Sequence, residues 1–433
     1  MSSQLRDHCE LKGGTAFPEY FQGKKEGDIA FIKVSDISIP ENRRYIQTAN
    51  NYVSRRIANQ LAANVFYAGT TVFAKVGAAL LLNRRRILTS PTIIDNNMMA
   101  AIATTADPTF LYYFLCSIDL AKYVQLGALP SVNQTTLGAI QFPEFSRAEQ
   151  KCIAHLLSSI DDAIEQTEAL IAKMQKIKAG LIHDLFTRGI IPNGQLRPLR
   201  EEAPQLYKES PLGWIPAEWS VYPLGCIAES MIDGPFGSNL KSEHYVDGSG
   251  VGVVRLQNIL ENEYNNSDRV FISEHRAMSL SRHSVTGGDV LIAALGDDTY
   301  PAGRACCYPE DLYPAINKAD CFRMRSRPSL AINAFVMGFL NTRCARIQTS
   351  RFVQGVTRRR INLGNMRRIL VPLPSIQEQK RIDAVLKQST SGRIFLENWR
   401  EKLAQQKSGL INDLLAGRVH VPESMLKEAS ASA

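Results

Sequence analysis

The chain has 433 residues, of which 45% are hydrophobic, so it is long enough for two or three domains with sizeable cores. Its net charge of +8 hints at an anionic partner, although many enzymes reach that value. The longest apolar run, AKVGAALLL, ends at NRRR and is too short for a membrane span, and the N-terminus lacks the apolar segment of a secretory signal. A cytoplasmic protein is therefore expected. The eight cysteines are scattered without a C-x-x-C pair, which predicts reduced and mostly buried thiols.

Residues 1–145 are predicted to form a first globular domain of mixed α and β structure. The alternation in IAFIKVSDI predicts a strand, and DPTFLYYFLCSIDLAKYVQ is typical of a helix. Three arginine groups, NRRY, SRRI and NRRRI, occur along this domain. Arginines of this kind can contact guanine or clamp phosphates, but any single pair can equally be a solvated surface.

A first long helix is predicted over 146–190. It starts at S-x-x-E, a capping box in which Ser146 accepts a backbone N–H and Glu149 reaches back to the N–H of the cap. Apolar residues then recur at alternating steps of three and four, which is the pattern of a coiled coil. The predicted pairing positions are Ile153, Leu156, Ile160, Leu170, Met174, Ile177 and Leu181.

The stretch 191–212 is rich in proline and charge and is predicted to be a linker. Residues 213–374 then form the predicted second globular domain, with strands such as GVGVVRLQNI and DVLIAAL and a helical LAINAFVMGFLNTRCARIQ. Counting Lys and Arg against Asp and Glu gives 14 and 11 over 1–145, and 18 and 15 over 213–374. Each domain thus carries +3, an excess small enough to favour focused recognition loops over a blanket of phosphate contacts.

A second long helix is predicted over 375–420, followed by a tail at 421–433. Its start is again S-x-x-E, with Glu378 expected to reach back to the cap. Because a glycine inside a helix costs about 1 kcal/mol relative to alanine, a bend or slip is expected near Gly392. The predicted pairing positions are Ile382, Val385, Leu396, Trp399, Leu403 and Leu410.

The two helical segments are copies of each other. Residues 149–190 and 378–419 are identical at 13 of 42 positions without a gap, where roughly two or three are expected by chance. Weaker matches precede each helix, such as FLYYFL (110–115) with FVMGFL (335–340) and FIKVSDI (31–37) with VVRLQNI (253–259). The expected fold class is therefore α+β: two tandem α/β domains, each followed by a long helix. The two helices are expected to pair as an antiparallel coiled coil about a pseudo-two-fold axis, although one ordinary core helix per domain is the alternative.

Two different globular domains on a paired-helix spacer suit a protein that recognises a split DNA sequence. The candidate DNA contacts are basic residues, amides and the segment GPFGS, which is equally well interpreted as a plain turn. They are Lys33, Arg43, Arg44, Arg55, Arg56, Arg84, Arg85, Arg86, Phe236, Ser238, Asn239, Lys241, Arg255, Gln257, Asn258, Arg304, Arg358, Arg359 and Arg360.

Signatures of catalysis are missing from the sequence. It contains no phosphate-binding G-x-x-x-x-G-K-[ST] loop, no Asn/Asp-Pro-Pro-aromatic methylase motif and no H-E-x-x-H. Asp297 and Asp298 could bind a metal, but a plain loop is favoured because the other copy has no matching carboxylates. A non-catalytic protein without its own cofactor or metal is expected. The alternatives left open are a self-sufficient DNA-modifying enzyme and a coiled-coil scaffold that binds only proteins.

The segment GVTRRRINLGNMRRILVPLPSIQEQKRI (355–382) resembles the junction before the conserved helix in DNA specificity subunits of type I restriction–modification enzymes. SPLGWIPAEWSVYPLG (210–225) resembles the usual beginning of that family's second recognition domain. The first junction departs from the pattern, because it lacks Pro-x-Pro and the arginines. The resemblance implies a subunit that places two methyltransferase subunits on a bipartite asymmetric site and joins motor-nuclease subunits through them. S-adenosylmethionine, ATP and Mg²⁺ would belong to those partners.

Overall fold

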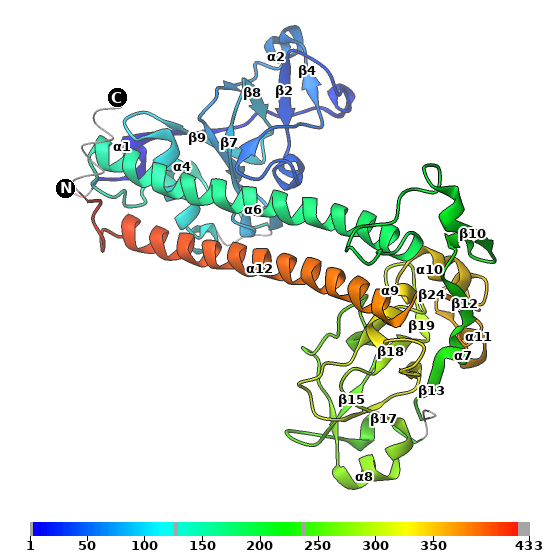
Figure 1. The fold of residues 1–433 in the computed structure, drawn as a ribbon. Helices are drawn as coiled ribbons and strands as arrows, with labels where there is room; N and C mark the ends of the chain where they lie inside the picture. The colour runs from blue at the N-terminus through cyan, green and yellow to red at the C-terminus, as the bar shows by residue number, and fades with distance from the viewer. Residues whose placement is uncertain (1–2, 125–128, 236, 238, 423–433) are drawn as a thin grey trace. The chain divides into compact units, whose positions relative to one another are not determined.

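The computed structural model describes residues 3–124, 129–235, 237 and 239–422. The chain divides into two compact units, unit 1 (Met1–Ala169 with Glu397–Ala433) and unit 2 (Leu170–Leu396). The two longest helices, α6 (Arg147–Thr187) and α12 (Ile376–Leu415), each contribute one part to each unit (Figure 1). The two predicted long helices are thus present, and the mixed α and β fold class is confirmed.

Unit 1 contains two sheets and a set of short helices. The five-stranded sheet has the order β1-β9-β6-β7-β3, and the four-stranded sheet has the order β4-β2-β8-β5, with β2 and β8 parallel. The strands are β1 (Cys9–Gly13), β2 (Ile29–Ile32), β3 (Tyr45–Ile46), β4 (Tyr52–Val53), β5 (Val65–Phe66), β6 (Thr71–Ala74), β7 (Arg85–Leu88), β8 (Thr92–Ile94) and β9 (Met98–Ala103). The helices before α6 are α1 (Leu5–His8), α2 (Arg55–Gln60), α3 (Ala78–Leu81), α4 (Pro108–Ser117) and α5 (Gln134–Gly138).

Unit 2 repeats this plan with additional small sheets. Its larger sheets have the orders β13-β22-β18-β20 and β14-β16-β15-β21-β17, and three strand pairs, β10-β11, β12-β24 and β19-β23, stand apart. The strands are β10 (Tyr207–Ser210), β11 (Gly213–Pro216), β12 (Ser220–Pro223), β13 (Ala228–Asp233), β14 (Tyr245–Val246), β15 (Val251–Val254), β16 (Phe271–Ile272), β17 (Ser284–Val285), β18 (Val290–Ala293), β19 (Leu295–Gly296), β20 (Ala305–Cys307), β21 (Ala315–Asn317), β22 (Cys321–Ser326), β23 (Arg359–Arg360) and β24 (Leu370–Leu373). The helices between α6 and α12 are α7 (Leu224–Ile227), α8 (Glu274–Ser279), α9 (Asn333–Leu340), α10 (Arg343–Ser350) and α11 (Leu363–Met366).

The strand pairings show that the internal repeat extends through both globular parts. β9 lies between β1 and β6 in unit 1, as β22 lies between β13 and β18 in unit 2. The parallel pair β2–β8 corresponds to the parallel pair β15–β21, and each is flanked by antiparallel strands. The weak sequence matches upstream of each helix therefore reflect one fold written twice.

One glutamine fixes each long helix to its own globular part. Gln150, 4% exposed, accepts the Asp107 N–H at 2.8 Å and donates to the Phe145 carbonyl at 3.0 Å. Gln379, fully buried, accepts the Ile332 N–H at 2.9 Å and donates to two carbonyls that include that of Pro374 at 3.0 Å. Because buried backbone groups need partners, this glutamine seals the junction in both copies.

The glutamate of S-x-x-E has diverged between the copies. In unit 1 the predicted capping box is complete: the Glu149 N–H donates to Ser146 Oγ at 3.3 Å, and the Ser146 N–H donates to Glu149 Oε2 at 2.8 Å. In unit 2 the Glu378 N–H donates to Ser375 Oγ at 3.3 Å, but the carboxylate turns elsewhere. It accepts from the Arg197 guanidinium, from the Trp219 indole N–H at 3.2 Å and from a backbone N–H. The expected reach back to the cap is corrected for this copy.

The segment predicted as a linker, 191–212, is folded. The Arg197 guanidinium is 4% exposed, donates to Glu378 and to the Arg188 carbonyl, and lies over Trp219. The Tyr207 hydroxyl donates to the Pro198 carbonyl at 2.7 Å, and β10 pairs with β11. The predicted linker is therefore held by hydrogen bonds, and Arg197 attaches it to the start of α12.

The two long helices pair in opposite directions within each unit. In unit 1, Cys152, Ile153 and Leu157 of α6 share a hydrophobic core with Leu414 of α12. In unit 2, Leu185 and Phe186 of α6 share a core with Ile382 of α12. The start of one helix thus packs beside the end of the other in both units, which confirms antiparallel pairing.

The buried stripe of α6 is displaced from the predicted one in its middle. Leu170 and Ile177 are 50% and 56% exposed, whereas Ile171 is 8% exposed. Asp161 and Lys178, which an apolar pattern passes over, take part instead: Asp161 pairs with Lys407 of α12 at 2.6 Å, and Lys178 donates to Thr390 at 3.0 Å. The buried positions in the middle of α6 thus lie one residue after the predicted ones, and they include polar side chains whose partners lie on α12. Trp399 of α12 is likewise 43% exposed.

The remaining predicted pairing positions are buried or half-buried. Ile153, Ile382 and Leu403 are buried. Leu156, Ile160, Met174, Leu181, Val385, Leu396 and Leu410 are half-buried.

A bend or slip was expected near Gly392, and helix α12 is continuous through this residue. A Cβ at this position would lie 3.0 Å from Met174 Cε of α6. The glycine therefore permits a close approach of the two helices within unit 2, which is the physical reason for its place in a helix interior.

Candidate nucleic-acid interface

Each unit carries the same short turn after its parallel strand. Lys33 and Arg255 stand before a single 3₁₀ turn, and the third residue after each caps it: the Lys33 N–H donates to Asp36 at 2.7 Å, and the Arg255 N–H donates to Asn258 at 2.8 Å. Asp36 and Asn258 are fully buried or nearly so. The fold thus presents one basic side chain at the same point of both units.

Those basic side chains are held by neighbours. The Lys33 ammonium donates to Gln22 at 2.8 Å, and the Arg255 guanidinium pairs with Asp268 at 2.6 Å. Gln257, which is exposed, donates to the same Asp268 at 2.9 Å. The hydrogen bonds from Gln257 and Arg255 lower the pKa of Asp268, which stays charged at neutral pH. Gln257 is thereby held with its amide at the surface.

A cleft of about 530 Å³ opens beside this turn in unit 2. Its rim carries Gln257, Tyr300 and Arg358, all exposed, and Tyr300 is 51% exposed. An amide, an aromatic ring and an unburied guanidinium are the groups that hydrogen-bond base edges, stack on bases and contact phosphates. We call this surface the η6 cleft, after the 3₁₀ turn η6 (Leu256–Asn258) on its edge.

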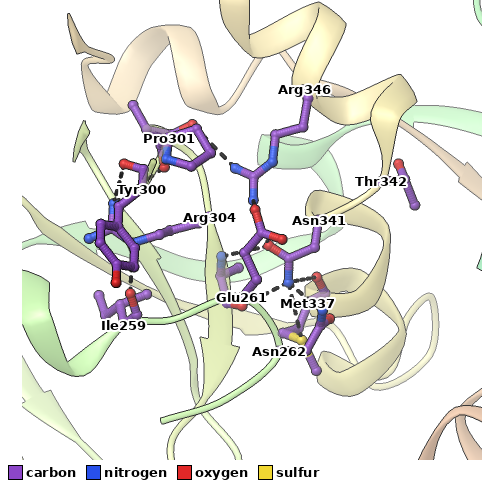
Figure 2. A network of polar contacts seen from close by, with 12 residues as sticks. Ile259, Glu261, Asn262, Tyr300, Pro301, Arg304, Met337, Asn341, Thr342 and Arg346 are labelled. Carbon is purple, nitrogen blue, oxygen red and sulfur yellow. Dashed lines mark hydrogen bonds and ion pairs between the residues drawn. The ribbon is translucent and has the colours of Figure 1, made fainter. Parts of the chain in front are cut away.

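The floor of the η6 cleft is Arg304, which is buried and not available to DNA. Its guanidinium donates to the Ile259 carbonyl at 2.7 Å (Figure 2). It also donates to the Leu256 carbonyl at 2.9 Å. Burial lowers the pKa of Arg304 from its ordinary value. Arg304 also donates to the Tyr300 and Pro301 carbonyls, so it joins the backbone at 256–259 to the loop at 297–301. Because its guanidinium is occupied by these carbonyls, its predicted role as a DNA contact is corrected.

The two aspartates beside the cleft, Asp297 and Asp298, stabilise the loop that contains them. Asp297 accepts the N–H groups of Thr299 at 2.9 Å and Tyr300 at 2.7 Å, and these bonds lower its pKa. Asp298 pairs with Arg359 at 3.0 Å. Throughout the part of the chain that the structure describes, no three His, Cys, Asp or Glu side chains gather as metal ligands. The loop interpretation is supported by the bonds that both carboxylates make to groups of the protein.

Several predicted contacts of unit 2 lie at the surface in ion pairs or short turns. Arg360 pairs with Asp320 at 2.7 Å, and Lys241 pairs with Glu243 at 3.4 Å. Asn239 is exposed. Exposed pairs of this kind are weak and can exchange a carboxylate for a phosphate. Phe236 and Ser238 lie outside the described residues.

In unit 1 the predicted arginines take three different roles. Arg55 and Arg56 are exposed on α2, and Arg84 is exposed and donates to Ser38 at 2.7 Å. Arg85 is 2% exposed and donates to the Ile118 carbonyl at 2.6 Å. Arg85 is therefore structural, whereas the other three remain candidates for DNA contact.

The other arginines of unit 1 bind protein groups. Arg86 donates to the Asn42 and Arg85 carbonyls. Arg43 and Arg44 form ion pairs with carboxylates of α6. Burial lowers the pKa of Arg86, and would lower that of Arg44, but hydrogen bonds with Tyr113 and Asp162 raise the pKa of Arg44 overall.

Comparison with known proteins identifies this arrangement. The family model for a type I restriction modification DNA specificity domain matches residues 1–176 and 239–405. The chain belongs to this family. A putative type I restriction enzyme specificity subunit, MjaX of Methanocaldococcus jannaschii, is 27% identical over 322 residues, covering 73% of this chain and 69% of that protein. The MjaVIII specificity subunit of the same organism is 24% identical over 430 residues, covering 94% and 91%.

The solved structures agree on the fold. The specificity subunit of a type I restriction–modification system from M. genitalium superposes with a TM-score of 0.57 at 15% identity and covers 96% of both chains. A structure described as showing complex assembly and conformational transition of a type I system gives a TM-score of 0.58 at 15% identity, covering 96% of this chain and 97% of that one.

As a specificity subunit, the chain is the non-catalytic part of a type I restriction–modification complex that recognises DNA sequence. The predicted family, the role in DNA sequence recognition and the non-catalytic role are therefore confirmed by the family match. Of the helices that the structure describes, none is long and apolar enough to cross a membrane.

Sequence reasoning missed some surface aromatics that suit DNA. Tyr300 on the rim of the η6 cleft was passed over, as were Tyr20 and Tyr67 of unit 1, which are 71% and 68% exposed. Their signal was available, since Tyr300 lies in a glycine-bounded loop, GDDTYPAG, where an aromatic residue has no core to enter.

Proposed function

We propose that this specificity subunit recognises a bipartite, asymmetric DNA site, with one half read by residues 1–145 and the other by residues 213–374. The observation that supports this most directly is one fold present twice with different side chains at matching surface positions. Lys33 and Ser35 in unit 1 match Arg255 and Gln257 in unit 2. Two domains with the same fold but different side chains at equivalent surface positions are suited to two different half-sites.

We further propose that the subunit binds two methyltransferase subunits and, through them, motor-nuclease subunits. The support is the repeat itself, since α6 and α12 are two copies of one helix and can offer related surfaces to two copies of one kind of partner. Leu170, Ile177 and Phe395 are exposed apolar residues on these helices, at 50%, 56% and 67%. Exposed apolar side chains on a charged helix surface favour a protein partner.

A domain exchange tests the two-part recognition. Residues 213–374 would be replaced by the corresponding domain of another family member, and the chimera reconstituted with the modification subunits of its own system. Sequencing of the methylated sites should show one half-site changed and the other retained. A matched exchange of 1–145 should change the opposite half. If either exchange altered both halves together, the proposal would be wrong.

A further inference from the structure

Two arginines of unit 1 attach its globular part to the side of α6. Arg44 is 8% exposed; its guanidinium donates to Asp162 and to the Ser158 carbonyl at 3.3 Å, and lies 4.0 Å from Glu165. Arg43 pairs with Glu168, one turn further along. The acceptors recur at helical spacing, so they form one acidic face of α6.

This attachment lies well away from the junction at the helix start. Gln150 fixes the first turn of α6, and Asp162 and Glu168 follow about 18 and 27 Å along the axis at 1.5 Å per residue. A body held only at the first point could swing about it. A swing of about 10° moves a point about 20 Å away by about 3.5 Å, which is the rise of one base pair.

Unit 2 has a corresponding attachment with the charges reversed. There the segment after η6 carries the acid: Glu263 lies 3.8 Å from Arg393 of α12. The same segment is held by its own domain, because Glu261 pairs with Arg346 at 2.7 Å and Asn262 accepts from Asn341 at 2.9 Å (Figure 2). In both units, therefore, the segment after the short turn meets the long helix through opposite charges.

We propose that Arg43 and Arg44 in unit 1, and Glu263 with Arg393 in unit 2, are positioning residues that set the number of base pairs between the two half-sites. They act by fixing the angle of each globular part on its helix and do not read bases. This inference rests on the proposed two-part recognition. It explains why Arg44, within the NRRY group, is buried against carboxylates when a DNA contact needs a free guanidinium.

The test uses the whole subunit in complex with its modification subunits. DNA molecules with both half-sites and a randomised spacer length are methylated and sequenced, so that spacer length and half-site bases are read together. The variants are Arg44→Gln, Arg44→Lys and Glu263→Gln. The matched control is Lys25→Gln, because Lys25 is an exposed basic residue of unit 1, is not a predicted DNA contact, and makes no hydrogen bond or ion pair with a long helix among the residues that the structure describes.

We expect wild type to methylate one dominant spacer length. Arg44→Gln should raise the share of molecules one base pair longer or shorter by at least about fivefold, the lower end of typical couplings between sites. Arg44→Lys, which keeps the charge, should restore most of the selectivity. Glu263→Gln should broaden the distribution with less risk to folding, since the Glu263 side chain is 64% exposed. In every variant the half-site bases should stay unchanged.

An unchanged spacer distribution in Glu263→Gln and in folded Arg44→Gln would overturn the inference. A change in half-site bases would also overturn it, because it would make these residues base readers. If Arg44→Gln does not fold, the Glu263→Gln distribution alone decides. Failure of the proposed function is a different outcome, in which wild type itself methylates no bipartite site.

Discussion

The cluster around Glu378 offers the sharpest test of how the two copies diverged. Glu378 and Glu149 occupy the same position of the repeat, so alanine at each removes the same atoms from different surroundings. The Glu378 side chain is 4% exposed and accepts two bonds from Arg197, one from Trp219 and one from the Ile190 N–H. The Glu149 carboxylate accepts a single backbone bond at an exposed helix start.

The magnitudes follow from burial. Removing one partner of a buried ion pair costs about 3–5 kcal/mol, because the other charge is left in a poor solvent. Glu218 keeps a bond to Arg197 at 2.8 Å and is itself mostly exposed, so the cost should fall near the lower end, about 3 kcal/mol. Loss of the exposed cap bond by Glu149→Ala should cost about 0.5–1 kcal/mol.

The assay is chemical unfolding followed by tryptophan fluorescence and far-ultraviolet circular dichroism. Trp219 is fully buried beside Glu378, while Trp214 and Trp399 are 48% and 43% exposed, so the fluorescence change reports chiefly on this cluster. Glu378→Gln should lie between wild type and Glu378→Ala. Equal losses of stability for Glu378→Ala and Glu149→Ala would refute the claim that the second glutamate has become a core anchor.

Three further outcomes are expected. Gly180→Ala should raise the free energy of unfolding by up to about 1 kcal/mol, and with it the melting temperature, because nothing lies within 4 Å of the added Cβ. Gly392→Leu should lower the melting temperature, because Met174 lies 3.0 Å from the Cβ position; similar shifts in both variants would contradict the close helix approach. Arg304→Met should cost about 3 kcal/mol or more in unfolding free energy by leaving buried carbonyls without donors, and a variant as stable as wild type would show that the floor of the η6 cleft is not held this way. Arg358→Ala should leave stability unchanged and either relax one half-site position by about 1–3 kcal/mol or weaken all sequences with a shallower salt dependence, measured by binding to singly substituted sites; no effect on binding would remove the cleft from the interface.

The first residues of the long helices could be predicted from the sequence because a helix start depends on hydrogen bonds within a few residues. Ser146 precedes a helix that begins at Arg147, and Ser375 precedes one that begins at Ile376. Hydroxyl caps act within three residues, so a linear pattern contains them. The duplication was equally visible, since the strands that match weakly in sequence occupy matching places in the sheets.

The roles of the arginines could not be predicted, because they depend on what the fold brings from far along the chain. Arg304 meets carbonyls at 256 and 259, and Arg44 meets α6 more than 110 positions later. Arginine serves both to satisfy buried carbonyls and to contact DNA, and the two roles can be told apart only by whether the side chain is buried in the fold. The predicted pairing positions of α6 were partly wrong for a related reason. Asp161 is buried opposite Lys407, and a pattern of hydrophobic residues does not include a charged residue whose partner lies on another helix.

Both copies of the repeat begin with Glu-Gln-Lys, at 149–151 and at 378–380, and the first two of these residues are under different constraints. Gln150 and Gln379 make the same bonds to their own globular parts, so every copy of the unit needs this residue wherever it stands in the chain. The glutamate one residue earlier, Glu149 or Glu378, contacts the chain at the start of its helix, and that chain differs between the copies. At Glu378 that chain is the segment from Arg188 to Trp219, which supplies a guanidinium and an indole N–H, and the carboxylate has left its cap to bind them. The glutamine therefore has the same role in both copies, because it joins each helix to its own globular part. The neighbouring glutamate does not have this role, so in the second copy Glu378 binds the segment that connects the two copies.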